Sequence, residues 1–98
     1  MDVTVGRACI VDTAGSVDHE SVLADRVHLG LGARLAGWVE VGEDAFVGAG
    51  AVVLPRVRIG RHTVVGAGSV VVRDLPNGMV AYGNPVRVRR EVGPPDAG

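Results

Sequence analysis

The sequence predicts an all-β protein in which short parallel strands wind in coils around a narrow, three-sided prism. Three observations predict this fold: a six-residue repeat, a high glycine content and a near absence of aromatic residues. The chain has 98 residues, of which 47% are hydrophobic but only 3% aromatic, and 15 are glycines. A chain this apolar is not disordered, and so much glycine disfavours helices. We therefore expect one domain with a thin aliphatic core.

The six-residue repeat runs without a gap from Val5 to Pro76. Its first position is aliphatic in every unit, its second is glycine in half of them, and its fifth is usually small. The first positions are Val5, Val11, Val17, Leu23, Leu29, Leu35, Val41, Val47, Val53, Ile59, Val65 and Val71. Self-similarity at a fixed period is the signature of a repeat architecture.

Each repeat unit supplies one side of the prism. Positions 5, 6 and 1 form an extended stretch in which positions 5 and 1 face inward and position 6 faces outward. Positions 2 to 4 form the corner, where glycine accepts backbone angles that other residues resist. Three sides close a coil of eighteen residues, which gives four coils: 5–22, 23–40, 41–58 and 59–76. A short C-terminal tail follows, and we expect residues 91–98 to be disordered.

The outward sixth positions predict where the prism meets a partner. One side carries Ile10, His28, Phe46 and Val64, an apolar column that one histidine interrupts. Exposed apolar patches usually mark contacts between proteins. We therefore expect this side to be an interface between subunits.

Several segments make the chain resemble the hexapeptide-repeat acyltransferases, and among them the sugar acetyltransferases of the NeuD/PglD type. These segments are VDHESV at 17–22, DRVH at 25–28, GARLAG at 32–37 and the turn Gly83-Asn84-Pro85. The resemblance implies a left-handed parallel β-helix, a homotrimer, and acetyl transfer from acetyl-CoA to a hydroxyl or amine of a sugar or nucleotide-linked sugar. We expect residues 1–90 to form the acyltransferase domain.

The resemblance implies that His19 is the general base. An imidazole, with an ordinary pKa of about 6.5, can remove a proton from a hydroxyl or amine at neutral pH. Glu20 matches the glutamate that makes this histidine more basic, because a nearby carboxylate favours the protonated ring. Gly37, one coil further at the same corner, matches the glycine whose backbone N–H stabilises the oxyanion. The alternative for His19 is a solvated corner histidine beside an acid.

The resemblance also implies three positions that bind the acyl donor. His28 matches a histidine beside the acetyl group, and Ala49 and Ala67 match positions whose backbone groups contact acetyl-CoA. The alternatives are an interface histidine and ordinary tight turns. The corner of His19 lies opposite the side that carries His28. We therefore expect the two histidines to meet only between subunits of a trimer.

Three further features stay open from the sequence. Asp12 stands where the family usually has asparagine, next to the expected site. Trp38 is expected to be an exposed corner aromatic that covers the acyl donor or a partner, or only packs. Arg87, Arg89 and Arg90 either meet the phosphates of the acyl donor, which suit arginine, or are solvated.

Composition argues against several classes of partner. The net charge is −1, which gives no reason to expect nucleic acid or an anionic membrane as a partner. Cys9 is the single cysteine, so an intrachain disulfide is impossible. No apolar run approaches the ~18 residues of a membrane span and no signal peptide is evident, so we expect a cytoplasmic protein. The three histidines lie at unrelated places, so we expect no metal site.

Two functional classes stay open. The chain starts close to the matched catalytic segment, and no G-x-G-x-x-G follows an apolar strand near its start. Family members carry an N-terminal α/β domain that binds the nucleotide-linked sugar, and we expect this chain to be truncated relative to them. It is then either a working acetyltransferase or a catalytically inactive remnant that serves as a trimeric structural module. Binding of acetyl-CoA discriminates the two.

Overall fold

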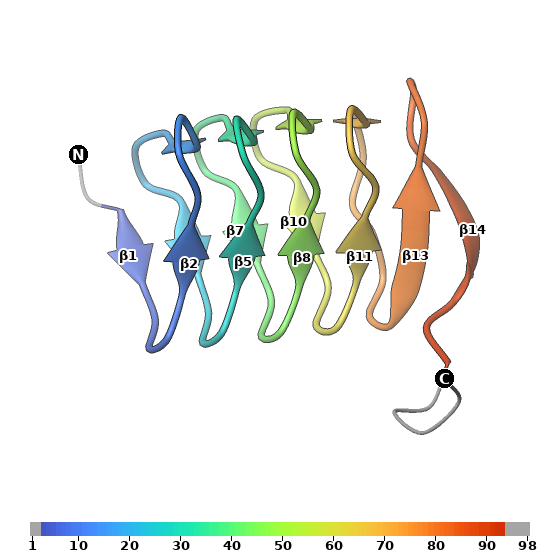
Figure 1. Ribbon diagram of the computed structural model, residues 1–98, viewed down its shortest axis with the longest axis horizontal. Coiled ribbons are helices and arrows are strands. Elements are labelled where there is room, and N and C mark those ends of the chain that lie inside the picture. Colours follow the sequence, from blue (N-terminus) through green and yellow to red (C-terminus); the bar gives the residue numbers. More distant parts are fainter. Residues whose placement is uncertain (1–2, 94–98) are drawn as a thin grey trace.

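The computed structural model describes residues 3–93 and confirms the predicted all-β, parallel β-helix (Figure 1). Short strands built from positions 6 and 1 of each unit alternate with tight turns. They are β1 (Thr4–Val5), β2 (Ile10–Val11), β3 (Ser16–Val17), β4 (Val22–Leu23), β5 (His28–Leu29), β6 (Arg34–Leu35), β7 (Glu40–Val41), β8 (Phe46–Val47), β9 (Val52–Val53), β10 (Arg58–Ile59), β11 (Val64–Val65) and β12 (Val70–Val71). Two longer strands follow, β13 (Met79–Tyr82) and β14 (Arg87–Glu91).

Every third strand belongs to the same side of the prism. The sheets run β1-β4-β7-β10, β2-β5-β8-β11 and β3-β6-β9-β12, and the second sheet continues into β13 and β14. Parallel pairs such as Ile10 with His28 and His28 with Phe46 hold the eighteen-residue register. In Figure 1 the chain rises along the front strands, crosses the top to the rear and advances to the right, so the coil is left-handed.

The core is a stack of aliphatic side chains from position 1. From Leu23 to Val71 each of these residues is at most 2% exposed. Small fifth-position residues fill the remaining space, and the buried hydroxyls among them are paired. Ser21 Oγ donates to the Ala36 carbonyl over 2.9 Å and accepts from the Val39 amide over 3.0 Å. In the first coil, Val5 and Val11 remain exposed, because no further coil in the described part of the chain covers them.

The corner glycines have two causes, of which the sequence predicted one. At position 2 a side chain would collide with the next coil: a Cβ on Gly42 would lie 2.6 Å from the Arg61 nitrogen, and one on Gly48 2.6 Å from the Ala67 nitrogen. The left-handed backbone occurs at position 4 instead, where eight non-glycine residues have positive φ, including Ala14 at 62°. The expectation that corner glycines supply unusual backbone angles is therefore confirmed at position 4, where Gly32, Gly50 and Gly68 each have φ 70°. At position 2 the close approach of backbones requires glycine instead.

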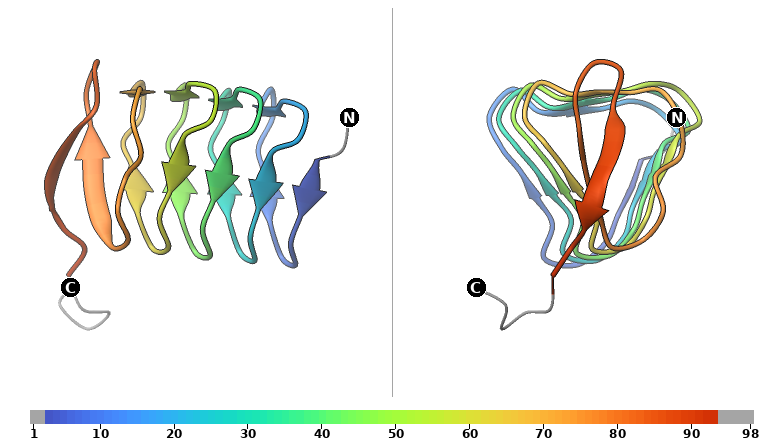
Figure 2. Two further views of the ribbon diagram at one scale, coloured as in Figure 1. Left: turned by 180° about the vertical axis from the view of Figure 1, so that it is seen from behind. Right: turned by 90° about the vertical axis from the view of Figure 1, so that its right-hand side faces the viewer.

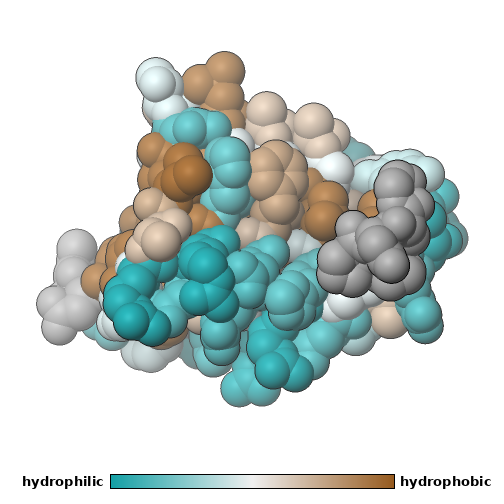
Figure 3. All heavy atoms as spheres, turned by 60° about the horizontal axis from the view of Figure 1, so that its bottom comes forward, coloured by the Kyte–Doolittle hydropathy of each residue, from teal (hydrophilic) through white to brown (hydrophobic). Residues whose placement is uncertain are grey.

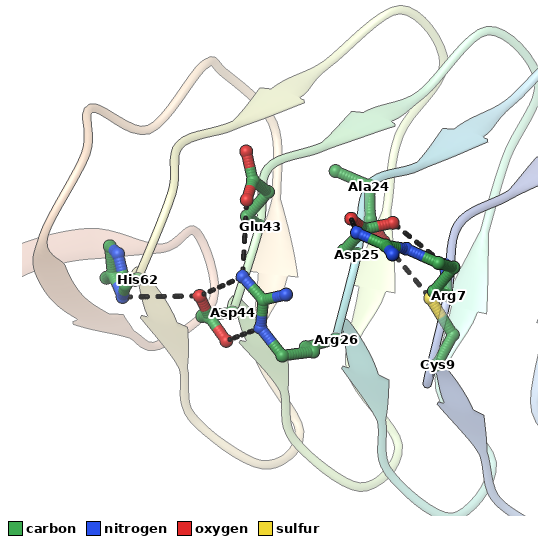
Figure 4. A network of polar contacts seen from close by, with 8 residues as sticks. All are labelled: Arg7, Cys9, Ala24, Asp25, Arg26, Glu43, Asp44 and His62. Atoms are coloured by element: carbon green, nitrogen blue, oxygen red, sulfur yellow. Dashed lines mark hydrogen bonds and ion pairs between the residues drawn. The ribbon is translucent and has the colours of Figure 1, made fainter.

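One edge of the prism is a ladder of ion pairs that links successive coils (Figure 4). It follows the turns between β1 and β2, β4 and β5, β7 and β8, and β10 and β11. Arg7 pairs with Asp25 over 3.3 Å. Arg26 pairs with Asp44 over 2.8 Å and with Glu43 over 3.2 Å. Each of these pairs joins one coil to the next, so the ladder ties the turns together along the prism axis.

A hairpin covers the C-terminal end of the prism, which the sequence did not predict. β13 pairs in parallel with β11 and β14 runs antiparallel to β13, and the hairpin lies across the triangular end in Figure 2. It buries Ala81 and Val86 to within 1% exposure. Glu91, expected in the tail, pairs with Met79 in this hairpin. Residues 94–98 of the expected disordered tail lie outside the described residues.

Candidate functional site

The candidate site centres on the edge of the prism that carries His19. His19 lies in the turn between β3 and β4, and Gly37 lies one coil further in the turn between β6 and β7. The Trp38 amide donates a hydrogen bond to the His19 carbonyl over 3.2 Å, which ties the two turns together. The His19 side chain is 43% exposed. The repeat therefore presents this imidazole to solvent on a backbone that its neighbouring coil fixes.

Asp18 determines which nitrogen of His19 is available. Its Oδ1 lies 2.9 Å from His19 Nδ1 and 2.8 Å from the His19 amide nitrogen. These hydrogen bonds, that from the amide first, hold the pKa of Asp18 below its ordinary value. An ionised carboxylate only accepts hydrogen bonds, so Nδ1 carries the proton in the neutral ring. The lone pair then lies on Nε2, the form that a general base needs.

Gly37 leaves room for the His19 ring and offers a hydrogen-bond donor beside it. A Cβ on Gly37 would lie 3.2 Å from both Cε1 and Nε2 of His19, so the ring rests against this glycine. Within residues 3–93 the Gly37 amide has no hydrogen-bond acceptor. A bare imidazole nitrogen and a free backbone N–H thus lie on neighbouring coils, which suits proton abstraction next to a developing oxyanion.

The carboxylate that the family resemblance implied for His19 was Glu20. Glu20 follows the histidine with a left-handed backbone, φ 60°, and its effect on the imidazole stays a prediction. Asp18 was missed by the sequence analysis. The aspartate immediately before His19 was the only signal for it, and sequence spacing does not say which neighbouring carboxylate turns toward a ring.

His28 lies on a different side of the prism, on β5, as the repeat register predicted. Its Nε2 lies 3.0 Å from Asp12 Oδ2, and its ring meets Phe46 edge-on with centroids 4.9 Å apart. Asp12 thus contacts His28 within the chain, and its place beside the His19 site stays a prediction. His19 and His28 do not come together within one chain, and their meeting between subunits stays a prediction.

Ala49 and Ala67 lie on the third edge of the prism. Ala49 is in the turn between β8 and β9, and Ala67 is in the turn between β11 and β12. The Gly68 amide donates to the Ala49 carbonyl over 2.8 Å. Both alanines are exposed, and their own amides have no acceptor among the described residues. This edge therefore presents two free backbone donors one coil apart.

One surface hollow adjoins the His19 edge, and a larger one lies on the side of the prism formed by β4, β7 and β10. A hollow of about 360 Å³ adjoins the His19 edge and is lined by Ser16, Asp18, Arg34 and Val52. A hollow of about 680 Å³ lies on the outer face of β7 and β10, where Glu40 and Arg58 line it. Among the described residues no three His, Cys, Asp or Glu side chains are placed to hold a metal ion.

The outer face of β2, β5, β8 and β11 is the apolar column expected from the sequence. Ile10 is 51% exposed, and Phe46 and Val64 are half-buried. Figure 3 shows this hydrophobic band above the hydrophilic strip that the ion-pair ladder forms. Across residues 3–93 no helix is long and apolar enough to cross a membrane.

Comparison with known proteins places the chain among hexapeptide-repeat transferases. Residues 39–73 match the family described as bacterial transferase hexapeptide (six repeats). A solved structure of perosamine N-acetyltransferase from Caulobacter crescentus, in complex with CoA and GDP-perosamine, superposes with a TM-score of 0.90 and 47% identity over 92% of this chain and 43% of that one. A search of curated protein sequences found no match.

Two further solved structures share the fold. Serine acetyltransferase from Neisseria gonorrhoeae has a TM-score of 0.88 and 28% identity over 97% of this chain and 41% of that one. WeeI from Acinetobacter baumannii has a TM-score of 0.87 and 29% identity over 90% of this chain and 44% of that one. The chain thus spans less than half the length of each of these three proteins.

Proposed function

Because the chain is a β-helix of the hexapeptide-repeat transferase type, we propose that it is an acetyl-CoA-dependent acetyltransferase acting on a sugar or nucleotide-linked sugar. The observation that carries the proposal is the arrangement of His19, with its Nδ1 held by Asp18 and its Nε2 beside Gly37. A perosamine N-acetyltransferase at 47% identity supports a sugar acceptor. We assign the activity to residues 1–90.

In this proposal His19 activates the acceptor. Its Nε2 takes the proton from the hydroxyl or amine of the sugar as that group attacks the thioester carbonyl. A new C–O or C–N bond forms while the carbonyl electron pair moves onto the oxygen. When the carbonyl re-forms, the C–S bond breaks, and the thiolate leaves with the proton that His19 held. Asp18, and in the family's pattern Glu20, stabilise the imidazolium formed in between.

Gly37 stabilises the negative charge that develops on the carbonyl oxygen. Its N–H is fixed by the turn and has no acceptor in the described chain. A donor that is already oriented needs no reorganisation when charge develops, and such donors typically contribute ~10²–10³ in rate. The carbonyl oxygen of the thioester and the attacking hydroxyl or amine of the sugar then lie at the same edge of the prism. Both are within reach of the His19 imidazole.

The acyl donor would bind between subunits. We assign its backbone contacts to the free amides of Ala49 and Ala67 and its acetyl end to the neighbourhood of His28. The apolar column of Ile10, Phe46 and Val64 supports association into a homotrimer, because burying it removes apolar surface from water. In that trimer His28 of one subunit would approach the His19 edge of the next. We propose a cytoplasmic location, without metal, nucleic acid or membrane as partners, and a NeuD/PglD-type subfamily.

Thermal unfolding of the purified chain with and without acetyl-CoA tests this proposal. A ligand that binds only the folded state raises the free energy of unfolding, by about 2.7 kcal/mol at a hundredfold excess over Kd, and with it the melting temperature. We expect a rise for the wild type and for His62→Ala, whose exposed histidine lies on the ion-pair edge, and none for His28→Ala. No rise for the wild type, together with no thiol release from acetyl-CoA, would favour the inactive structural module instead.

A further inference from the structure

We propose that Trp38 is the surface on which the acceptor sugar stacks, and that Arg56 holds its ring in place. This inference rests on the proposed acetyltransferase function and names one residue that would recognise the acceptor. Trp38 is the only tryptophan of the chain. It follows Gly37 directly, and its amide donates to the carbonyl of His19. The indole therefore belongs to the same edge as the candidate base and its oxyanion donor.

Neither folding nor packing accounts for a tryptophan at this position. Trp38 has a left-handed backbone, φ 63°, which is unfavourable for a bulky side chain. The residue is 49% exposed, so core burial does not compensate. The other non-glycine residues in the same place of the described repeat are alanines or charged and polar residues: Ala8, Ala14, Glu20, Arg26, Asp44, Arg56 and His62. Backbone strain and exposed apolar surface together are typical of functional sites.

Arg56 fixes the plane of the indole from the next coil. Its Cζ lies 5.4 Å from the centroid of the Trp38 ring, within the range of a cation–π contact. The backbones are also joined, since the Arg56 amide donates to the Gly37 carbonyl over 3.0 Å. A ring covered on one face by a guanidinium and still half exposed is a pre-oriented apolar surface on the edge that carries His19.

A sugar ring fits this surface better than the nucleotide that carries it. The reacting hydroxyl or amine must reach His19 Nε2, which lies against Gly37, so the ring that bears this group lies close to Gly37 and to the residue that follows it, Trp38. The C–H face of a pyranose is apolar and carries slight positive charge, which complements the negative face of an aromatic ring. The nucleotide would lie further away. The arm of the acyl donor and a neighbouring subunit are the competing occupants of this surface.

Tryptophan fluorescence tests the stacking directly, because Trp38 is the only indole. The probe is whichever nucleotide-linked amino sugar, from a panel that includes GDP-perosamine, the wild-type chain acetylates. We expect that sugar to change the Trp38 emission in a saturable way in the absence of acetyl-CoA. The free nucleotide should give a much smaller change.

Steady-state kinetics of three variants complete the test. Trp38→Ala should raise the KM for the sugar about tenfold, the loss expected for one aromatic stacking contact, with the KM for acetyl-CoA unchanged. Trp38→Phe should recover much of the affinity. Tyr82→Ala is the matched control, because Tyr82 is an exposed aromatic with its own cation–π partner, Arg89, at 4.5 Å; it should leave the sugar KM unchanged.

The outcomes separate this inference from the function on which it rests. If the wild type acetylates no sugar, the proposed function is wrong and the inference falls with it. If the wild type is active but the emission does not respond to the sugar, the inference alone is overturned. It is also overturned if Trp38→Ala raises the KM for acetyl-CoA instead, or if the variant loses the oligomeric state of the wild type.

Discussion

His19 Nδ1 lies 2.9 Å from Oδ1 of Asp18, and this contact selects Nε2 as the nitrogen that faces Gly37. The first prediction follows from it. Asp18→Asn replaces an obligatory acceptor with an amide whose NH2 group can donate to Nδ1, which moves the ring proton to Nε2. We expect kcat to fall at least tenfold while the KM for acetyl-CoA stays within twofold. Steady-state kinetics measure both parameters.

Glu20→Gln is the comparison for that variant. If Asp18 orients the base, the asparagine variant loses more activity than the glutamine variant. A larger loss of activity from Glu20→Gln would mean that Glu20, the residue implied by the family resemblance, and not Asp18 orients His19.

Gly37→Ala should reduce activity without unfolding the chain. The added methyl group would lie 3.2 Å from Nε2 and Cε1 of His19, so the exposed ring must move away from its present position. Displacement of a base by a fraction of an ångström commonly costs rate, and we expect kcat to fall at least tenfold. Circular dichroism should show the wild-type β-sheet signal. A folded Gly37→Ala variant with the kcat of the wild type would mean that the reaction does not take place between His19 and Gly37.

The two kinds of corner glycine should respond differently to alanine. A Cβ on Gly48 would lie 2.6 Å from the Ala67 nitrogen, whereas a Cβ on Gly50 meets open space. The alanine in Gly50→Ala need only adopt φ near +70°, and Ala8 and Ala14 already have similar angles, 57° and 62°. This left-handed conformation should cost about 1–2 kcal/mol of stability. Overpacking at Gly48 costs about 3 kcal/mol or more, because backbone must shift. Denaturant unfolding ranks the two variants, and a larger loss for Gly50→Ala would contradict this account.

Much of the fold followed from the sequence because the repeat determines the register. An aliphatic residue every six positions fixes which side chains point inward, and eighteen residues per coil place His19, Gly37 and Ala49 on their edges. The Asp18 contact was not predictable, since it depends on the rotamer of one exposed side chain. The hairpin of Met79–Tyr82 and Arg87–Glu91 was missed because the repeat ends at Pro76, and no periodicity extends into it.

The ion-pair ladder predicts how stability depends on acid. Hydrogen bonding to Arg26 lowers the pKa of Asp44, and hydrogen bonding to the Arg7 amide lowers that of Asp25. A carboxyl group whose pKa is lower in the folded state stabilises the fold at pH values above its ordinary pKa of 3.8. This contribution is lost as the pH falls through the lowered pKa. Asp44→Asn should lower the free energy of unfolding at neutral pH and flatten its decline below about pH 4.

Urea unfolding at a series of pH values measures this effect. Glu40→Gln is the control, because its pair with Arg58 spans 3.4 Å between two exposed side chains and should contribute little. An Asp44→Asn variant with the wild-type pH dependence would mean that the ladder does not stabilise the fold through this carboxylate.

The most direct measurement of the central claim is acetyl transfer itself, followed as thiol release from acetyl-CoA in the presence of a nucleotide-linked amino sugar. We predict turnover by the wild-type chain and by His62→Ala. His19→Ala should lower kcat by about 10²–10⁴ while retaining the stabilisation by acetyl-CoA. Wild-type turnover by His19→Ala would remove this histidine from the mechanism, and no sugar-dependent thiol release from the wild type would contradict the proposed function.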